Sequence, residues 1–208
     1  MANARSEDFK SDLCRLSFAG GLFKARAVEA GTTPKFSATL IFPKSARAGL
    51  EKIVAKVLTD EWGPEGLKRA AAGKIRSPFL AGDGKEAKDD SGALKPGMGP
   101  DLFFIRVQAN EDRPPVVWWR DPNRQETEAT VYSGCYGKAI LNCFAWKHKT
   151  GGDGVSFGIQ GFQKHAEGER LGGSGAINPE RWSEKIEDEG PAPESTMSGA
   201  GAGGLFGS

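Results

Sequence analysis

The sequence predicts a mainly β fold, a small barrel with one amphipathic helix and a disordered acidic C-terminal tail. Short segments in which apolar and polar residues alternate recur along the chain, and Gly, Pro and Asp separate them. Only one segment carries a clear helical repeat of apolar residues. Many short strands with one helix fit an OB-fold, a partly open barrel of about five strands, or a slightly larger barrel. A jelly roll or another sandwich is the alternative.

The alternation gives the order of the elements. Strands are expected over residues 13–18, 35–42, 102–109, 116–120, 136–147 and 155–164. The helix is expected after Pro43, with Ser45 as its N-cap and an apolar stripe made by Leu50, Ile53, Val54, Val57 and Leu58. Residues 63–100 break the regularity, with room for a second short helix before a polar loop.

Length and composition bound the organisation. The 208 residues suffice for one domain with a sizeable core. We expect a flexible segment over residues 1–11, a folded domain over 12–175, and a disordered Gly-rich tail over 176–208.

Composition also argues against several classes of protein. No apolar run of about 18 residues occurs, and the first residues lack the apolar stretch of a signal peptide. Cys14, Cys135 and Cys143 have no CxxC spacing, which argues against a disulfide framework and a zinc site. A cytoplasmic protein without metal or cofactor is therefore expected.

Alternation separates an inner from an outer face on three strands. The expected inner residues are Phe103, Ile105, Val107 and Ala109, then Ala139, Leu141, Cys143 and Ala145, then Val155, Phe157 and Ile159. The opposite faces carry aromatic rings beside cationic or amide side chains. The expected rings are Phe104, Tyr136, Phe144, Trp146 and Phe162, and their neighbours are Arg106, Lys138, Asn142, Lys147 and Lys164. Of the adjacent Trp118 and Trp119, one must point inward, and the sequence does not decide which.

Rings beside cations predict binding to single-stranded nucleic acid. Every base has a flat face, so stacking on an aromatic ring works for any sequence, and Lys or Arg neutralise the phosphates. A duplex hides its base faces, which favours single strands. The alternative is that these rings pack in the core, with the small residues of 139–145 beneath the helix.

The motifs "VYSGCYGKAILNCFAW" and "GVSFGIQGFQKHAEGERLGG", with the earlier "KFSATLIFPKS", resemble the DUF2815 family of phage single-stranded DNA-binding proteins. The resemblance covers roughly residues 12–173. It implies an OB-fold similar to that of T7-like phage single-strand binders. It also implies a protein that coats single-stranded DNA during phage replication or recombination, in the cytoplasm of the host cell.

The charge is distributed unevenly. From Ile177 onward the chain holds six acidic and two basic residues, which leaves 26 basic and 21 acidic residues before it. The tail resembles those with which replicative single-strand binders recruit partner enzymes. Its acidic candidates are Glu187, Asp188 and Glu189, and its apolar tip is Leu205 and Phe206. Gly207 and Ser208 follow Phe206, so a pocket that reads a terminal Phe would not be satisfied. A merely solubilising tail, or one that competes with DNA for the basic body, are the other interpretations.

An enzyme and a structural or protein-interaction module are the alternative functions. An enzyme would need a site, and no catalytic residues are expected: Cys135 and His148 have no third orienting group, and no P-loop occurs. A structural or protein-interaction β-module of a phage would explain the strands. It would leave the charge difference between body and tail without a reason.

Overall fold

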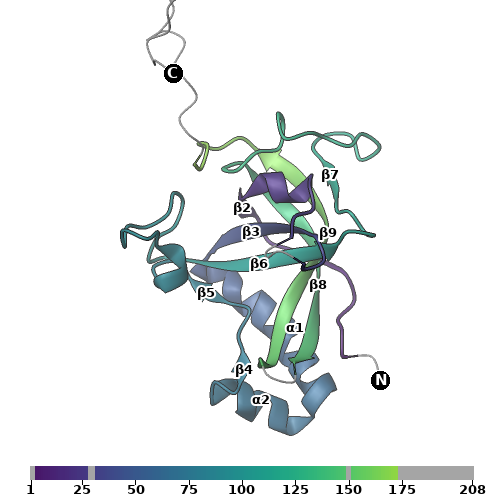
Figure 1. Ribbon diagram of the computed structural model, residues 1–208, viewed down its shortest axis with the longest axis vertical. Coiled ribbons are helices and arrows are strands. Elements are labelled where there is room, and N and C mark those ends of the chain that lie inside the picture. The colour runs from purple at the N-terminus through teal and green to yellow at the C-terminus, as the bar shows by residue number, and fades with distance from the viewer. Residues whose placement is uncertain (1–2, 28–30, 149–150, 173–208) are drawn as a thin grey trace, which may run out of the picture. The chain divides into compact units, whose positions relative to one another are not determined.

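The computed structural model describes residues 3–27, 31–148 and 151–172, which form a mainly β unit (Figure 1). Its strands are β1 (Phe9–Lys10), β2 (Cys14–Ser17), β3 (Lys35–Pro43), β4 (Ile75–Arg76), β5 (Leu80–Ala81), β6 (Leu102–Asn110), β7 (Val116–Trp118), β8 (Tyr136–His148) and β9 (Gly152–Ala166). Its helices are α1 (Arg47–Trp62) and α2 (Pro64–Ala71), with 3-10 turns η1 (Ala19–Leu22), η2 (Lys44–Ala46) and η3 (Lys85–Ala87). The predicted tail lies outside the described residues.

Five of the strands pair in a closed circuit. β3 pairs with β2 and β6, and β8 pairs with β2 and β9, all antiparallel. β6 and β9 complete the circuit as a parallel pair, in which Val107 lies opposite Phe157. Figure 1 shows β3 and β6 running across the long β8–β9 hairpin. Each of these strands overlaps a segment that alternation predicts, because one face of each is buried.

Two helices follow β3 where the sequence clearly predicts one. Leu50, Val54, Val57 and Leu58 are the buried stripe of α1, as predicted. The helix packs against β8 and β9. The prediction of a Ser45 N-cap is wrong, because η2 occupies 44–46 and α1 begins at Arg47 without a side-chain cap. None of the helices in the described part of the chain is long and apolar enough to cross a membrane.

The core lies inside the strand circuit. The predicted inner residues of β6, β8 and β9 are almost all buried there, and Ala109 is half-buried. Phe42 and Phe103 stack with ring centroids 5.4 Å apart, and Phe79 meets Phe103 edge-on. Trp118 and Trp119 are both half-buried.

A β-bulge reverses the predicted faces in the second half of β9. Leu141 pairs with Ile159 but Ile140 pairs with Gly161, so Gln160 is one extra residue on β9. One extra residue sends the following side chains to the other face. Phe162 and Lys164 therefore point inward and are 0% and 2% exposed. The prediction that both lie on the open face is wrong.

Phe104 does lie on the outer face of β6, as predicted, but it is covered. The loop over residues 82–100 folds across this end of the strand. Phe104 packs with Ile41, Ala87 and Leu171 in a second, smaller cluster and is 2% exposed. The prediction of an open ring at Phe104 is therefore wrong.

The N-terminal segment is a strand-like addition to β8. Ser6 N donates to Cys143 O, Ala145 N to Ala4 O, and Ser11 N to Ala139 O, each at 2.8–2.9 Å. β1 continues this pairing with β8. The expectation of a flexible segment over 1–11 does not hold for residues 4–11, because their backbone groups are hydrogen-bonded.

Candidate nucleic-acid interface

A hollow of about 740 Å³ lies over the outer face of β3 and β6. Its floor is a set of polar cross-strand pairs: Ser37 lies opposite Gln108, and Thr39 opposite Arg106. These side chains point outward because their neighbours Ala38, Leu40, Ile105 and Val107 fill the core. We call this space the central hollow.

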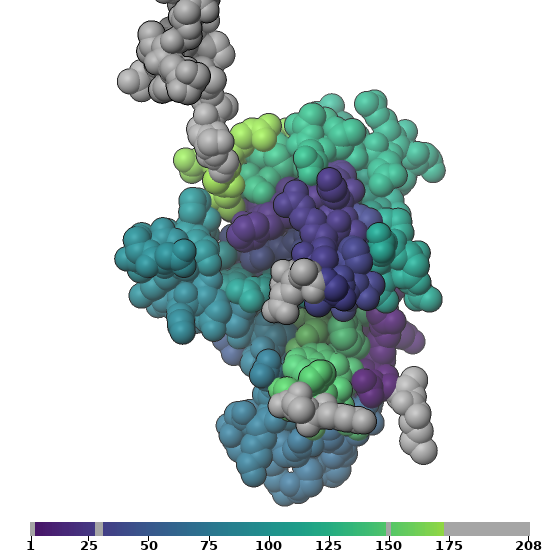
Figure 2. Space-filling model, in the orientation of Figure 1, coloured from purple at the N-terminus to yellow at the C-terminus, as the bar shows by residue number. Residues whose placement is uncertain are grey.

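Two loops wall the central hollow. One contributes Phe18, Arg26, Thr32 and Thr33 from the chain between β2 and β3. The other is the 82–100 loop, which contributes Lys95 and Met98. Figure 2 shows the 82–100 loop as a lobe on the left, beside the purple segment that contains η1.

The central hollow is basic. Among the described residues its cations are Arg26, Lys35, Lys95 and Arg106, and Glu86 supplies one carboxylate. In the described residues no ion pair involves any of these four cations. Lys95 Nζ donates to the backbone oxygen of Glu86 at 3.0 Å. Cations without carboxylate partners keep a positive potential that phosphates can neutralise.

A side hollow of about 330 Å³ adjoins the central one and shares Lys35 and Gln108 with it. It adds Arg5, Arg113 and the half-buried ring of Phe144. The Arg5 guanidinium lies 5.8 Å from the Phe144 ring centroid, and it donates to Asn142 Oδ1 at 3.0 Å. No acidic side chain lines this hollow among the described residues.

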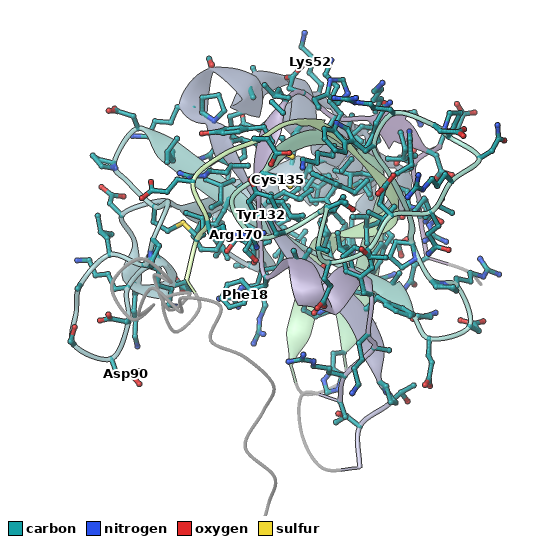
Figure 3. The ribbon with its side chains drawn as sticks, turned by 90° about the horizontal axis from the view of Figure 1, so that it is seen from above. Phe18, Lys52, Asp90, Tyr132, Cys135 and Arg170 are labelled. Carbon is teal, nitrogen blue, oxygen red and sulfur yellow. The ribbon has the colours of Figure 1, made fainter. Side chains whose placement is uncertain are left out.

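At the other end, the central hollow leads toward Tyr132. Phe18, Lys95 and Met98 also line a third hollow, which shares Ser133 and Gly172 with a fourth. Tyr132 and Arg170 line that fourth hollow, with the guanidinium 3.9 Å from the ring centroid. Figure 3 shows Phe18, Tyr132 and Arg170 close together, and Lys52 and Asp90 at the edges. We call the four adjoining hollows the basic groove.

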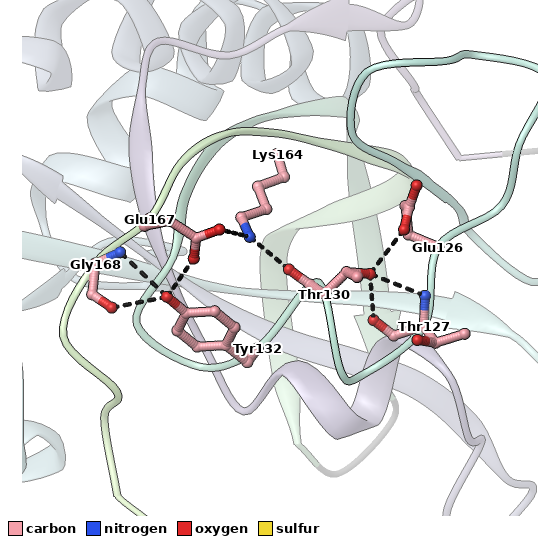
Figure 4. A network of polar contacts seen from close by, with 7 residues as sticks. All are labelled: Glu126, Thr127, Thr130, Tyr132, Lys164, Glu167 and Gly168. Atoms are coloured by element: carbon pink, nitrogen blue, oxygen red, sulfur yellow. Dashed lines mark hydrogen bonds and ion pairs between the residues drawn. The ribbon is translucent and has the colours of Figure 1, made fainter.

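A buried cation fixes the Tyr132 end of the groove (Figure 4). Lys164 Nζ donates to Thr130 O and to Glu167 Oε1, both at 2.6 Å, and lies 4.2 Å from the Trp119 ring centroid. These partners offset the cost of burying an ammonium group. The hydrogen bonds from Lys164 and then from the Tyr132 hydroxyl lower the pKa of Glu167. Lys164 is therefore a structural cation. It was predicted to face solvent, but it is buried.

The sequence matches, over residues 9–190, the family described as "Enterobacter phage Enc34, ssDNA-binding protein". The chain belongs to this family. The predicted relation to phage single-stranded DNA-binding proteins is thereby confirmed. The alternative of a β-module without nucleic-acid binding is not favoured.

Solved structures share the fold of this family member. The single-stranded DNA-binding protein of bacteriophage Enc34 in complex with ssDNA aligns with a TM-score of 0.58 and 18% identity, covering 79% of this chain and 89% of that one. Gp2.5, a single-stranded DNA-binding protein of bacteriophage T7, aligns with a TM-score of 0.53 and 13% identity, covering 90% and 98%. Protein p50 of Acyrthosiphon pisum secondary endosymbiont phage 1 is 25% identical over 166 residues, 77% of this chain and 85% of that protein.

The structure does not bring the predicted site residues of this chain together in one place. Arg106 and Phe144 line the basic groove, and the covered Phe104 also lines its central hollow. Asn142 is 2% exposed, and its side chain is held between Arg5 and Asp8. Tyr136 and Lys138 are half-buried near the start of β8, where Arg15 lies 5.6 Å from the Tyr136 ring centroid.

Trp146 and Lys147 lie at the hairpin end of β8. The Trp146 ring lies across Gly154, and its Nε1–H donates to Ser156 Oγ at 2.9 Å. Lys147 forms an ion pair with Glu61 of α1. Neither residue lines the basic groove. Grouping them with Arg106 in one site is therefore not supported by the geometry.

The sequence analysis did not identify the loop residues that line the basic groove of this chain. Phe18 ends the predicted strand 13–18, whereas in the structure it follows the end of β2 and is 63% exposed. Arg26 and Lys95 lie in segments without periodicity, and only their positive charge marked them. Lys35 could have been found, since it starts the predicted second strand on the polar side.

Cys135 and His148, the candidate nucleophile pair of an enzyme, are far from a catalytic arrangement. Cys135 precedes β8 and is fully buried, whereas His148 ends the same strand. Burial raises the pKa of Cys135 and raises that of Cys143 to about 12. A high thiol pKa disfavours the nucleophilic thiolate. Among the described residues, no three His, Cys, Asp or Glu side chains gather as a metal site would require.

Proposed function

We propose that this chain binds single-stranded DNA in the basic groove without sequence preference, and coats and protects it during phage DNA replication or recombination. The observation that carries the proposal is the set of cations over β3 and β6 that form no ion pair among the described residues, on a chain of a single-stranded DNA-binding family. Lys35, Arg106 and Arg26 would neutralise successive phosphates and release counterions. Base faces would lie against rings such as Phe144, whatever the sequence.

We further propose that the closed circuit of β2, β3, β6, β8 and β9 is an OB-fold barrel. An OB-fold has five strands, and its second and third strands with the loop between the first two bind oligonucleotides. Here the second and third strands of the circuit are β3 and β6, which form the floor of the central hollow. The loop between β2 and β3 supplies Phe18 and Arg26. The position of the basic groove thus fits this assignment.

The domain boundaries, the role of the acidic tail and the place of action are further parts of the proposal. The folded domain would span residues 12–175, with the strand-like segment 4–11 added to it. The acidic residues Glu187, Asp188 and Glu189 and the apolar tip at Leu205 and Phe206 would recruit replication or recombination enzymes from a position outside the described residues. The protein would act in the host cytoplasm.

Fluorescence anisotropy of labelled oligonucleotides tests the function. We expect oligo(dT) and a mixed-sequence single strand of equal length to bind with similar affinity, and a duplex of that length to bind more weakly. Affinity should fall with salt on a log–log plot by about 0.7 per phosphate neutralised. Absence of binding to any single strand at low salt would refute the proposal. A strong preference for one sequence would refute the sequence-independent mode.

A further inference from the structure

Phe18 has an unusual backbone and an unusual exposure. It is the one non-glycine residue with positive φ in the described part of the chain, at φ 56° and ψ 42°. Its side chain is 63% exposed, the highest value among the exposed large apolar residues described. An L-residue with a side chain of this size is disfavoured in this left-handed conformation. Both the left-handed backbone and the exposed ring of Phe18 therefore lower the stability of the fold.

The turn around Phe18 is held from several sides. Ala19 N donates to Ser133 Oγ at 2.9 Å, and Gly21 N donates to Phe18 O at 3.1 Å. Gly21 lies so close to β3 that a Cβ there would meet Ser37 O at 2.1 Å. These contacts hold the backbone from which the Phe18 side chain projects. Strained backbone that is held in this way is typical of ligand sites.

Phe18 lies where two parts of the basic groove meet. It lines the central hollow with Arg26 and Arg106, and it lines the third hollow with Lys95 and Met98. A ring surrounded by cations favours a flat ligand that carries negative charge at its edge. A nucleotide has this combination of a flat base and a phosphate.

The other two accessible rings of the groove already carry a guanidinium. Arg170 lies over Tyr132 at 3.9 Å, and Arg5 lies near Phe144 at 5.8 Å. In the described residues, no ring or cation pairs with Phe18. A base can therefore stack on the Phe18 ring without displacing an arginine side chain.

We propose that Phe18 is a preset stacking platform for one unpaired nucleobase, at the middle of the path that the DNA takes through the basic groove. The proposal rests on the function proposed above and adds to it the position of one base. The left-handed backbone presents the ring, and the neighbouring cations hold the phosphates on either side. Stacking at this point requires no rearrangement of the protein.

Phe18→Gly separates this role from a structural one. Glycine accepts positive φ without strain, so the melting temperature should stay unchanged or rise by up to about 4 °C. Affinity for oligo(dT) should nevertheless fall about tenfold, because one stacked base is lost. Phe18→Trp should keep the affinity of the original protein. Leu67→Ala, at a 46% exposed apolar residue on α2, is the matched control and should leave affinity unchanged.

An oligonucleotide with abasic sites identifies the partner of the ring. If Phe18 stacks on a base, Phe18→Gly should make little difference to the binding of a fully abasic strand of the same length. Equal losses on dT and abasic strands would overturn the proposal, as would unchanged binding of dT. A fall in melting temperature with normal affinity would also overturn it. If the protein without substitutions binds no single strand at all, the proposed function itself is refuted.

Discussion

Arg106→Ala should weaken single-stranded DNA binding in a way that depends strongly on salt. Arg106 is exposed at the floor of the central hollow, opposite Thr39, and no carboxylate pairs with it in the described residues. Removing one phosphate contact should lower the log–log salt slope by about 0.7. The corresponding loss of affinity is about fivefold at 0.1 M salt and about 25-fold at 0.01 M. Anisotropy titrations with oligo(dT) at several salt concentrations measure both quantities.

Lys52→Ala is the matched control for charge. Lys52 is exposed on α1, and Figure 3 shows it on the other side of the molecule from Phe18. Charges separated by more than about 10 Å are largely screened at 0.1 M salt, so this variant should bind as the original protein does. Equal changes of slope in the two variants would show that net charge alone controls binding. An unchanged slope in Arg106→Ala would refute a phosphate contact at the central hollow.

Three other outcomes are expected. Phe162→Ala should lower the free energy of unfolding by about 3–5 kcal/mol in urea denaturation, because the ring is fully buried, and a loss below about 1 kcal/mol would contradict its place in the core. Hydrogen bonds from Lys147 and from the backbone of Ala4 lower the pKa of Glu61 below its ordinary value, so stability present above about pH 4.5 should be lost as pH falls through the lowered pKa. Glu61→Gln should remove that part of the dependence of melting temperature on pH, and an identical profile would argue against it. Truncation after Gly175 should tighten DNA binding at low salt if the acidic tail competes for the basic groove, and unchanged affinity would count against competition.

Alternation in the sequence located the strands because each has one face in the core. Phe103, Ile105 and Val107 occupy every second position of β6, and all three are buried as expected. The same rule failed after Gln160, because a bulge adds one residue without changing the composition of the strand. Nothing in the local pattern distinguishes Phe162 as an inner residue. Its position depends on the register with β8, which is a tertiary property.

The basic groove was harder to predict than the strands because half of it is made by loops. The 82–100 loop and the chain around Arg26 have no periodicity, so the position of Arg26 and Lys95 over β3 and β6 could not be deduced from spacing. The burial of Phe104 has the same origin. Its side of the strand was predicted correctly, but the loop that covers it was not. Face assignment therefore identifies what can be exposed, and only the packing of loops decides what is.

A sequence motif of rings and cations does not by itself mark a nucleic-acid site, as the hairpin end of β8 shows. Trp62 is flanked there by Arg69 at 5.6 Å and Lys147 at 5.8 Å from its ring centroid. Both cations are neutralised by carboxylates, since Arg69 pairs with Asp153 and Lys147 with Glu61. A phosphate would have to displace those carboxylates, and the net gain would be small. In the central hollow the described cations have no such partners, so a phosphate there displaces no carboxylate. The cations of the central hollow thus differ from Arg69 and Lys147 in having no carboxylate partner among the described residues, a difference that composition does not reveal.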